Sequence, residues 1–81
     1  MVEYYGKTIS TYERKYVDKF NGEIRTQNIF IVSTTKQFLY GNSWNGRWKC
    51  SLKTGKWYRY VNYEWHSQCG EYTKIEESRG N

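Results

Sequence analysis

The sequence predicts a mainly β protein, built as a small antiparallel sheet or a partly open barrel of about five strands. Aromatic residues make up 20% of the 81 residues, and Tyr, Trp and Phe suit a pleated sheet surface. Ala, the strongest helix former, is absent, and Leu occurs only twice. Turn signals such as Asn21-Gly22 and Thr54-Gly55 separate runs of alternating residues.

The length predicts one domain. A chain of this size sits near the lower limit for a single hydrophobic core. We expect residues 1–77 to form that domain and the polar residues 78–81 to form a C-terminal tail. An edge strand over 2–5 or 7–11 precedes the first hairpin in this prediction.

Asn21-Gly22 predicts the first hairpin, because both residues tolerate positive φ. The flanking strands are expected over 11–20 and 24–33. A bulged turn at 21–23 would place two apolar sets on one side of the sheet. These sets are Tyr12, Tyr16 and Phe20 from one strand, and Ile24, Phe30 and Val32 from the other.

Residues 34–40 fit two structures. Thr34 followed by Gln37 has the spacing of a helix capping box, and Gly41 could end a short helical turn. The other interpretation is a strand over 37–40. The shortness of the segment and its aromatic residues favour the strand.

A long hairpin is predicted over residues 47–66, with strands at 47–52 and 57–66 and a two-residue turn at Thr54-Gly55. An edge strand over 71–77 follows it. With that turn, Leu52 lies opposite Trp57, Cys50 opposite Arg59 and Trp48 opposite Val61. These residues, with Tyr63 and Trp65, form the predicted core side of the hairpin.

The opposite side of the same hairpin is predicted to be basic and aromatic, with Lys49 across from Tyr60 and Arg47 across from Asn62. Lys and Arg neutralise phosphates, aromatic rings stack on bases, and Asn forms hydrogen bonds with base edges. Trp44 lies in the loop beside this surface. The candidate binding residues are therefore Trp44, Arg47, Lys49, Lys53, Lys56, Tyr58, Tyr60 and Asn62.

The charge distribution also indicates an anionic partner. The formal net charge is +5, and no acidic residue occurs between Glu23 and Glu64. Seven Lys and Arg residues lie in that interval. Such an asymmetry favours binding to a polyanion.

We therefore expect a non-catalytic module that binds single-stranded DNA or RNA, or another phosphate-rich partner. Surface strands also carry Lys, Arg and Tyr for solubility alone, so a purely solvated face is an open alternative. A second alternative is a small phage-type inhibitor or adaptor that binds a host protein through its aromatic surface. A third is sugar binding by Trp44, Trp48, Trp57 or Trp65.

Other classes of function are disfavoured. Cys50, His66 and Cys69 lack the closely spaced Cys pair of a zinc site, so we expect no metal or other cofactor. His66 is the only neutral-pH base and has no motif beside it, so no enzyme is predicted. The first ten residues show no signal peptide and no apolar run spans a bilayer. We expect a cytoplasmic protein with free cysteines and no membrane partner.

Overall fold

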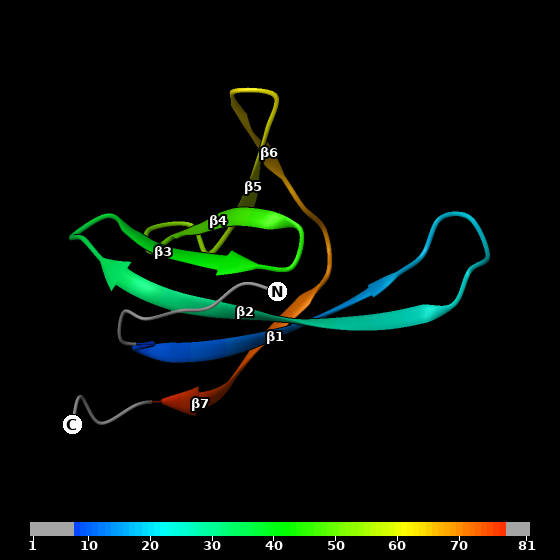
Figure 1. The fold of residues 1–81 in the computed structure, drawn as a ribbon, viewed down its shortest axis with the longest axis horizontal. Helices are drawn as coiled ribbons and strands as arrows, with labels where there is room; N and C mark the ends of the chain where they lie inside the picture. Colours follow the sequence, from blue (N-terminus) through cyan, green and yellow to red (C-terminus); the bar gives the residue numbers. More distant parts are fainter. Residues whose placement is uncertain (1–7, 78–81) are drawn as a thin grey trace.

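A computed structural model describes residues 8–77 and confirms the mainly β prediction (Figure 1). The described residues form a single open antiparallel sheet of seven strands, two more than predicted, and no helix. The predicted tail over 78–81 and the first of the two positions predicted for an edge strand, 2–5, lie outside the described residues. At the second position, 7–11, Ser10 and Thr11 belong to the first strand of the hairpin instead. The strands are β1 (Ser10–Val17), β2 (Ile24–Thr34), β3 (Phe38–Ser43), β4 (Gly46–Ser51), β5 (Trp57–Val61), β6 (Glu64–Ser67) and β7 (Glu71–Glu77).

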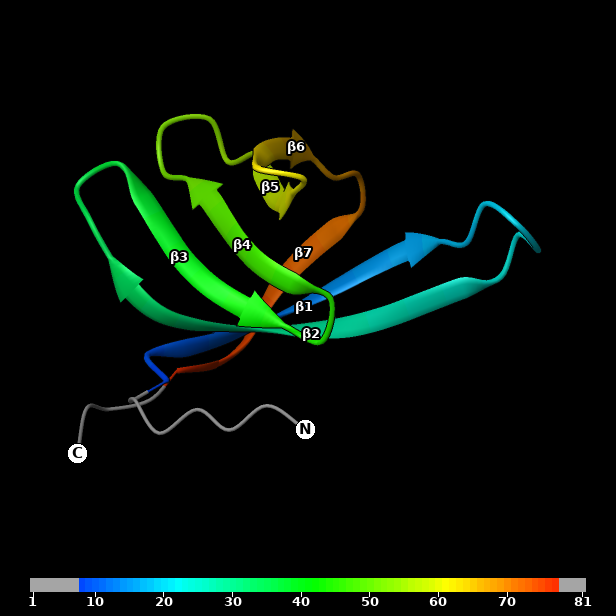
Figure 2. The same ribbon diagram turned by 45° about the horizontal axis from the view of Figure 1, so that its top comes forward.

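The strand order explains the shape of the sheet. Strands β1 to β6 follow one another as neighbours, whereas β7 pairs with β1, so the order is β6-β5-β4-β3-β2-β1-β7. Consecutive strands β6 and β7 thus occupy opposite edges, yet only residues 68–70 join them. The sheet must curl for so short a link to connect its edges. In Figures 1 and 2, β5 and β6 run across the direction of β1 and β2.

The core fills the concave side of the curled sheet. Ile29, Ile31 and Trp48 are fully buried, and Cys50 and Trp57 nearly so. Tyr12, Leu39 and Tyr72 pack against this cluster. The rings of Trp57 and Tyr72 stack, with centroids 4.7 Å apart and planes 5° apart. Because Trp57 lies on β5 and Tyr72 on β7, aromatic packing holds the two ends of the sheet together.

Gly41 allows β3 to lie close to β2 in the centre of the sheet. A Cβ atom at this position would stand 2.6 Å from the carbonyl oxygen of Phe30 and 2.9 Å from Cδ1 of Ile31. Both distances are shorter than van der Waals contact. A side chain here would therefore displace the backbone or the buried Ile31.

A polar network crosses the core beside the aromatic cluster. The buried Arg14 donates one hydrogen bond to the Cys69 carbonyl oxygen (2.9 Å) and another to Oε1 of Gln27 (2.9 Å). Nε2 of Gln27 donates to the Ser43 hydroxyl and to the Asn45 side chain. The network therefore joins β1, β2, the β3–β4 turn and the link between β6 and β7.

The predicted first hairpin forms, but with a different loop and register. Strand β1 ends at Val17, and the amide of Gly22 donates to the Asp18 carbonyl oxygen across a longer turn. Tyr12 pairs with Ile29, so its side of the sheet carries Ile29 and Ile31. The predicted set of Ile24, Phe30 and Val32 was wrong, because Tyr12 pairs with Ile29 and not with Val32. This register difference of three residues, an odd number, turns the predicted set to the other face. Phe20, predicted to lie on the apolar side, is 99% exposed.

Residues 34–40 contain no helical turn. A turn at residues 35–37 leads into β3, and the Thr35 hydroxyl accepts hydrogen bonds from the amides of Gln37 and Phe38. The hydroxyl cap read from the sequence therefore exists one residue later, where it closes a turn between strands. The strand interpretation was correct, and β3 extends to Ser43.

The hairpin over 47–66 is divided into two hairpins. Asn62 and Tyr63 have φ angles of 51° and 66° and form a two-residue turn between Val61 and Glu64. The predicted single strand over 57–66 was therefore wrong. The reversal at 62–63 places Trp65 beside Tyr60, on the face opposite the core, and leaves Tyr63 90% exposed.

The pairing of β4 with β5 is displaced by two residues from the prediction. Cys50 pairs with Trp57, Lys49 with Tyr58 and Trp48 with Arg59. The connection closes with the Ser51 amide donating to the Lys56 carbonyl oxygen, so it is longer than the expected two-residue turn. A shift of two preserves which side chains face the core. Leu52, however, now lies in the loop after β4 and not opposite Trp57, and its side chain is half exposed.

Candidate functional site

The convex side of β3 to β6 carries the candidate site. Strand pairing places Tyr40 beside Lys49, Lys49 beside Tyr58, and Tyr60 beside Trp65. Alternate residues of each strand share a face, so the side chains from all four strands form one surface. We call it the aromatic–basic face, and it consists of Phe38, Tyr40, Arg47, Lys49, Tyr58, Tyr60 and Trp65.

Lys49 lies at the centre of the aromatic–basic face. Its Nζ stands 4.4 Å from the ring centroid of Phe38, 4.5 Å from Trp65 and 5.9 Å from Tyr58. An ammonium group over aromatic rings is attracted by their negative faces. The contact keeps a half-buried cation in place without a carboxylate and draws rings from β3, β5 and β6 toward it.

A pocket of about 400 Å³ opens on this face. The adjacent β2 has an irregularity in its pairing between Ile31 and Ser33, at Val32. Such bulges bend a strand and open space beside it. The pocket is lined by Val32, Tyr40, Gly41, Asn42, Arg47, Trp48 and Trp65.

More cations lie at one end of the face. The β2–β3 turn and the β4–β5 loop meet there, since the Leu52 amide donates to the Gln37 carbonyl oxygen. Lys36 and Lys53 line a pocket of about 430 Å³ together with Phe38, which also contacts Lys49. The loop cations are therefore continuous with the aromatic–basic face.

The structure brings together four of the eight sequence-predicted site residues. Arg47, Lys49, Tyr58 and Tyr60 all lie on the aromatic–basic face, with Arg47 and Tyr60 exposed. Lys53 and Lys56 are exposed in the loop at one end of β4.

The two remaining residues lie in turns beyond the other end of β4. Trp44 is 73% exposed in the β3–β4 turn. Asn62 occupies the β5–β6 turn, so the prediction that it lies across from Arg47 in a strand was wrong; Arg47 pairs with Asn42 instead.

Sequence reasoning missed three aromatic members of the face. Phe38 and Tyr40 alternate in the short β3, and this alternation was the available signal for their common side. Trp65 was assigned to the core because no Gly marks the turn at Asn62-Tyr63. Its position depends on a turn that the sequence signals only weakly.

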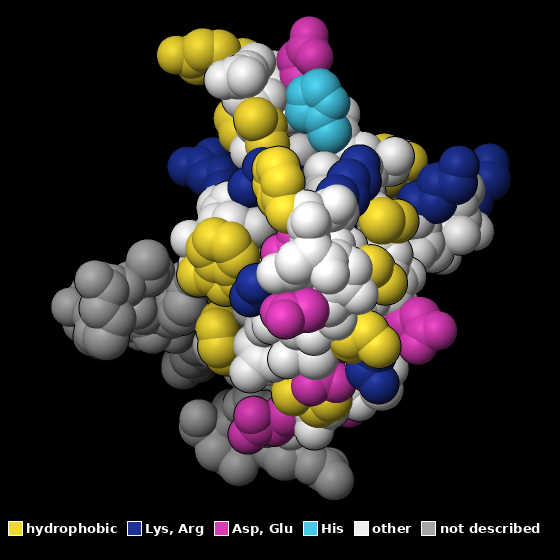
Figure 3. Space-filling model, turned by 90° about the vertical axis from the view of Figure 1, so that its right-hand side faces the viewer, with side chains coloured by type: hydrophobic (Ala, Val, Ile, Leu, Met, Phe, Trp, Pro, Cys, Tyr) yellow, Lys and Arg dark blue, Asp and Glu magenta, His cyan; other side chains and the backbone are white. Residues whose placement is uncertain are grey.

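Charges separate along the molecule. Among the described residues, the ion pairs involve Arg25, His66 and Lys74, and none involves Arg47, Lys49, Lys53 or Lys56. Glu71, Glu76 and Glu77 all lie on β7, at the far edge of the sheet from β6. In Figure 3, acidic side chains occur mostly in the lower part of the molecule and basic ones mostly above them.

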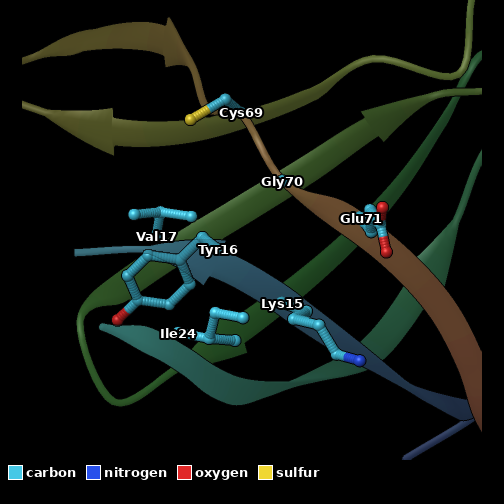
Figure 4. Close-up of a pocket in the computed structure, with 7 residues that line it drawn as sticks. All are labelled: Lys15, Tyr16, Val17, Ile24, Cys69, Gly70 and Glu71. Atoms are coloured by element: carbon cyan, nitrogen blue, oxygen red, sulfur yellow. The ribbon is translucent and has the colours of Figure 1, made fainter. Parts of the chain in front are cut away.

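A second pocket, of about 440 Å³, lies between the ends of β1 and β2 and the link to β7 (Figure 4). Val17 and Ile24 give it an apolar wall, and Lys15 and Glu71 contribute one charge of each sign. This lining is less suited to an anion than the aromatic–basic face. Cys69 also lines it and is free and exposed.

The remaining reactive groups are placed as follows. Cys50 is free and buried, and burial raises the pKa of its thiol. His66 is exposed and lies 3.6 Å from a Glu64 carboxylate oxygen. Within residues 8–77, no three His, Cys, Asp or Glu side chains cluster in a way that could hold a metal ion.

Comparisons with protein families, curated proteins and solved structures found no significant match. The described part of the chain has no helix long and apolar enough to cross a membrane.

Proposed function

We propose that the protein is a non-catalytic module that binds single-stranded nucleic acid on its aromatic–basic face. The observation that carries the proposal is the arrangement of Lys49 among Phe38, Tyr58 and Trp65, beside the exposed Arg47 and Tyr60. Proteins that bind single strands combine a cationic groove for the phosphates with aromatic side chains on which bases stack.

The charge pattern supports the same function. Arg47, Lys53 and Lys56 are exposed and have no carboxylate of the described residues within ion-pair distance. Lys36 and Lys53 extend the positive charge from the face to the adjacent loops. A single strand crossing the sheet from these loops toward Tyr60 would meet cations and rings in turn.

The first test is titration with an unstructured oligonucleotide, such as oligo(dT) or oligo(U), with Trp fluorescence as the readout. Stacking on Trp65 should change the fluorescence, and the logarithm of the affinity should fall linearly with the logarithm of the salt concentration. No binding of either oligonucleotide at low salt would overturn the proposal.

Two substitutions locate the site. Arg47→Ala should weaken binding and reduce the salt slope by about 0.7, the contribution of one phosphate contact in a single strand. Tyr60→Ala should weaken binding by about 1–3 kcal/mol, the usual value of one stacked base. Lys74→Ala, which removes a cation from β7, is the matched control and should change little. Unchanged affinity in both face variants would contradict the assignment.

A protein partner is the second candidate function, and one observation favours it. Phe20, Trp44 and Tyr63 are 99%, 73% and 90% exposed at the ends of three hairpins. Aromatic residues of this kind anchor protein interfaces. If the protein instead acts as a small inhibitor or adaptor, oligonucleotides should not bind, and Tyr63→Ala or Trp44→Ala should abolish capture of one partner protein.

A further inference from the structure

We propose that the pocket beside Arg47 accepts one base of the bound strand and prefers guanine. This inference rests on the proposed nucleic-acid function and deepens it by assigning a base preference. The pocket volume of about 400 Å³ falls in the range of sites for one small ligand. Its position on the aromatic–basic face places it on the expected path of a single strand.

The walls of the pocket suit a planar ring. Tyr40 from β3 and Trp65 from β6 both line it, so aromatic surfaces come from strands on either side of β4. Val32 of β2 and the backbone of β3 at Gly41 complete its lining. A base can stack on such rings irrespective of its identity, which gives affinity without selectivity.

The polar lining supplies the selectivity. Arg47 presents only hydrogen-bond donors, and nearby Lys49 also presents only donors, with its Nζ 4.5 Å from the Trp65 ring centroid. Asn42 offers an amide donor and an amide acceptor, and Tyr40 offers a hydroxyl group. The described residues place no carboxylate in this pocket.

Guanine matches this set of donors better than the other bases. It offers two adjacent acceptors, O6 and N7, which a guanidinium group contacts with two parallel hydrogen bonds. Adenine pairs an acceptor with a donor on the same edge, and cytosine presents a donor there. Arg47 has no ion-pair partner among the described residues, so a base would not compete with a carboxylate for its donors.

The test uses four octanucleotides of thymidine that differ at one central position, which is G, A, C or T. A single guanine prevents association of strands through guanine quartets. The oligonucleotide with guanine should bind about tenfold more tightly than the other three. Replacing that guanine by 7-deazaguanine, which lacks the N7 acceptor, should remove most of the preference.

Arg47→Lys tests the residue. Lysine keeps the charge but not the planar pair of donors, so the ratio of affinities for the G and T oligonucleotides should fall toward one. Arg25→Lys, an exposed position in the β1–β2 hairpin, is the matched control and should keep the ratio. If all four oligonucleotides bind equally, the base preference is wrong and the proposed function stands. If none binds, the proposed function itself fails.

Discussion

At the scale of single residues, the half-buried Tyr72 contributes both its ring and its hydroxyl group to the packing. Its ring stacks on Trp57, and its hydroxyl donates a 3.0 Å hydrogen bond to the Gln68 carbonyl oxygen. Burial raises the pKa of Tyr72 to about 12, against the opposing effect of the nearby Arg14. The protonated hydroxyl is thus part of the contact that holds β7 to the far end of the sheet.

Tyr72→Phe should therefore change how stability depends on pH. The variant loses one hydrogen bond, about 1 kcal/mol at neutral pH. Above pH 10, the ordinary pKa of tyrosine, the unfolded wild type releases this proton while the folded form retains it, so wild-type stability falls. Urea unfolding from pH 7 to 11 should show the stability difference between wild type and variant shrinking above pH 10. A difference that stays constant over this range would mean that the pKa of Tyr72 is not raised.

At the scale of elements, the β5–β6 hairpin determines the composition of the aromatic–basic face. Its turn requires positive φ at both central residues, Asn62 and Tyr63. Asn tolerates this conformation, whereas a tyrosine there is strained by about 1–2 kcal/mol. The strain is held by the pairing of Val61 with Glu64 and of Tyr60 with Trp65.

Tyr63→Gly should stabilise the protein. It creates Asn-Gly, the preferred pair for this turn, and the Tyr63 side chain is too exposed to lose packing. Removal of the strain stabilises the folded state, and the extra flexibility of glycine stabilises the unfolded chain by a smaller amount. The net effect should raise the unfolding free energy by about 0.5–1 kcal/mol. Chemical denaturation measures this change. Tyr63→Ala retains the Cβ atom and should give no gain; an equal gain with Ala would assign the effect to loss of the exposed ring.

At the scale of the whole molecule, stability depends on joining the two ends of an open sheet. Strands β6 and β7 each have one neighbour among the described strands, so backbone pairing does not close the sheet. Side-chain contacts across the core do so instead, and they include the Trp57–Tyr72 stack, the contact between the Tyr12 and Trp57 rings, and the bond from Arg14 to the Cys69 carbonyl oxygen. Arg14 also lies 4.0 Å from the Tyr16 ring centroid.

Arg14→Met should weaken this closure. The change leaves the Cys69 carbonyl and the Gln27 side-chain oxygen without their donor, at about 1–3 kcal/mol for each buried acceptor. We expect a loss of about 2–4 kcal/mol in the unfolding free energy, with faster amide hydrogen exchange at Gln68 and in β7 than in β3. Lys15→Met, at the exposed neighbouring position, should change neither measurement. Uniform acceleration of exchange in all strands would contradict a local role in closure.

The sheet class and the sides of most side chains were predictable from alternation. Trp57 faces the core and Tyr58 and Tyr60 face away from it, as the pattern indicated, because side chains on a strand alternate whatever its partner. Alternation carries no information about shifts of two residues, so the β4–β5 register was predicted wrongly although the faces were right.

The candidate site was therefore only half predictable. Arg47, Lys49, Tyr58 and Tyr60 belong to local strand patterns, which neighbouring residues determine. Phe38, Tyr40 and Trp65 join them only because β3 and β6 pair on either side of β4 and β5. Those pairings depend on the loop lengths and on the strained turn at Asn62-Tyr63. The strain of that turn is offset by packing across the entire sheet, which a local sequence pattern does not reveal. The local sequence thus determines the strands and which side of each strand faces solvent. The rings that surround Lys49 are determined by the pairing of distant strands in the curled sheet, because only that pairing brings them together.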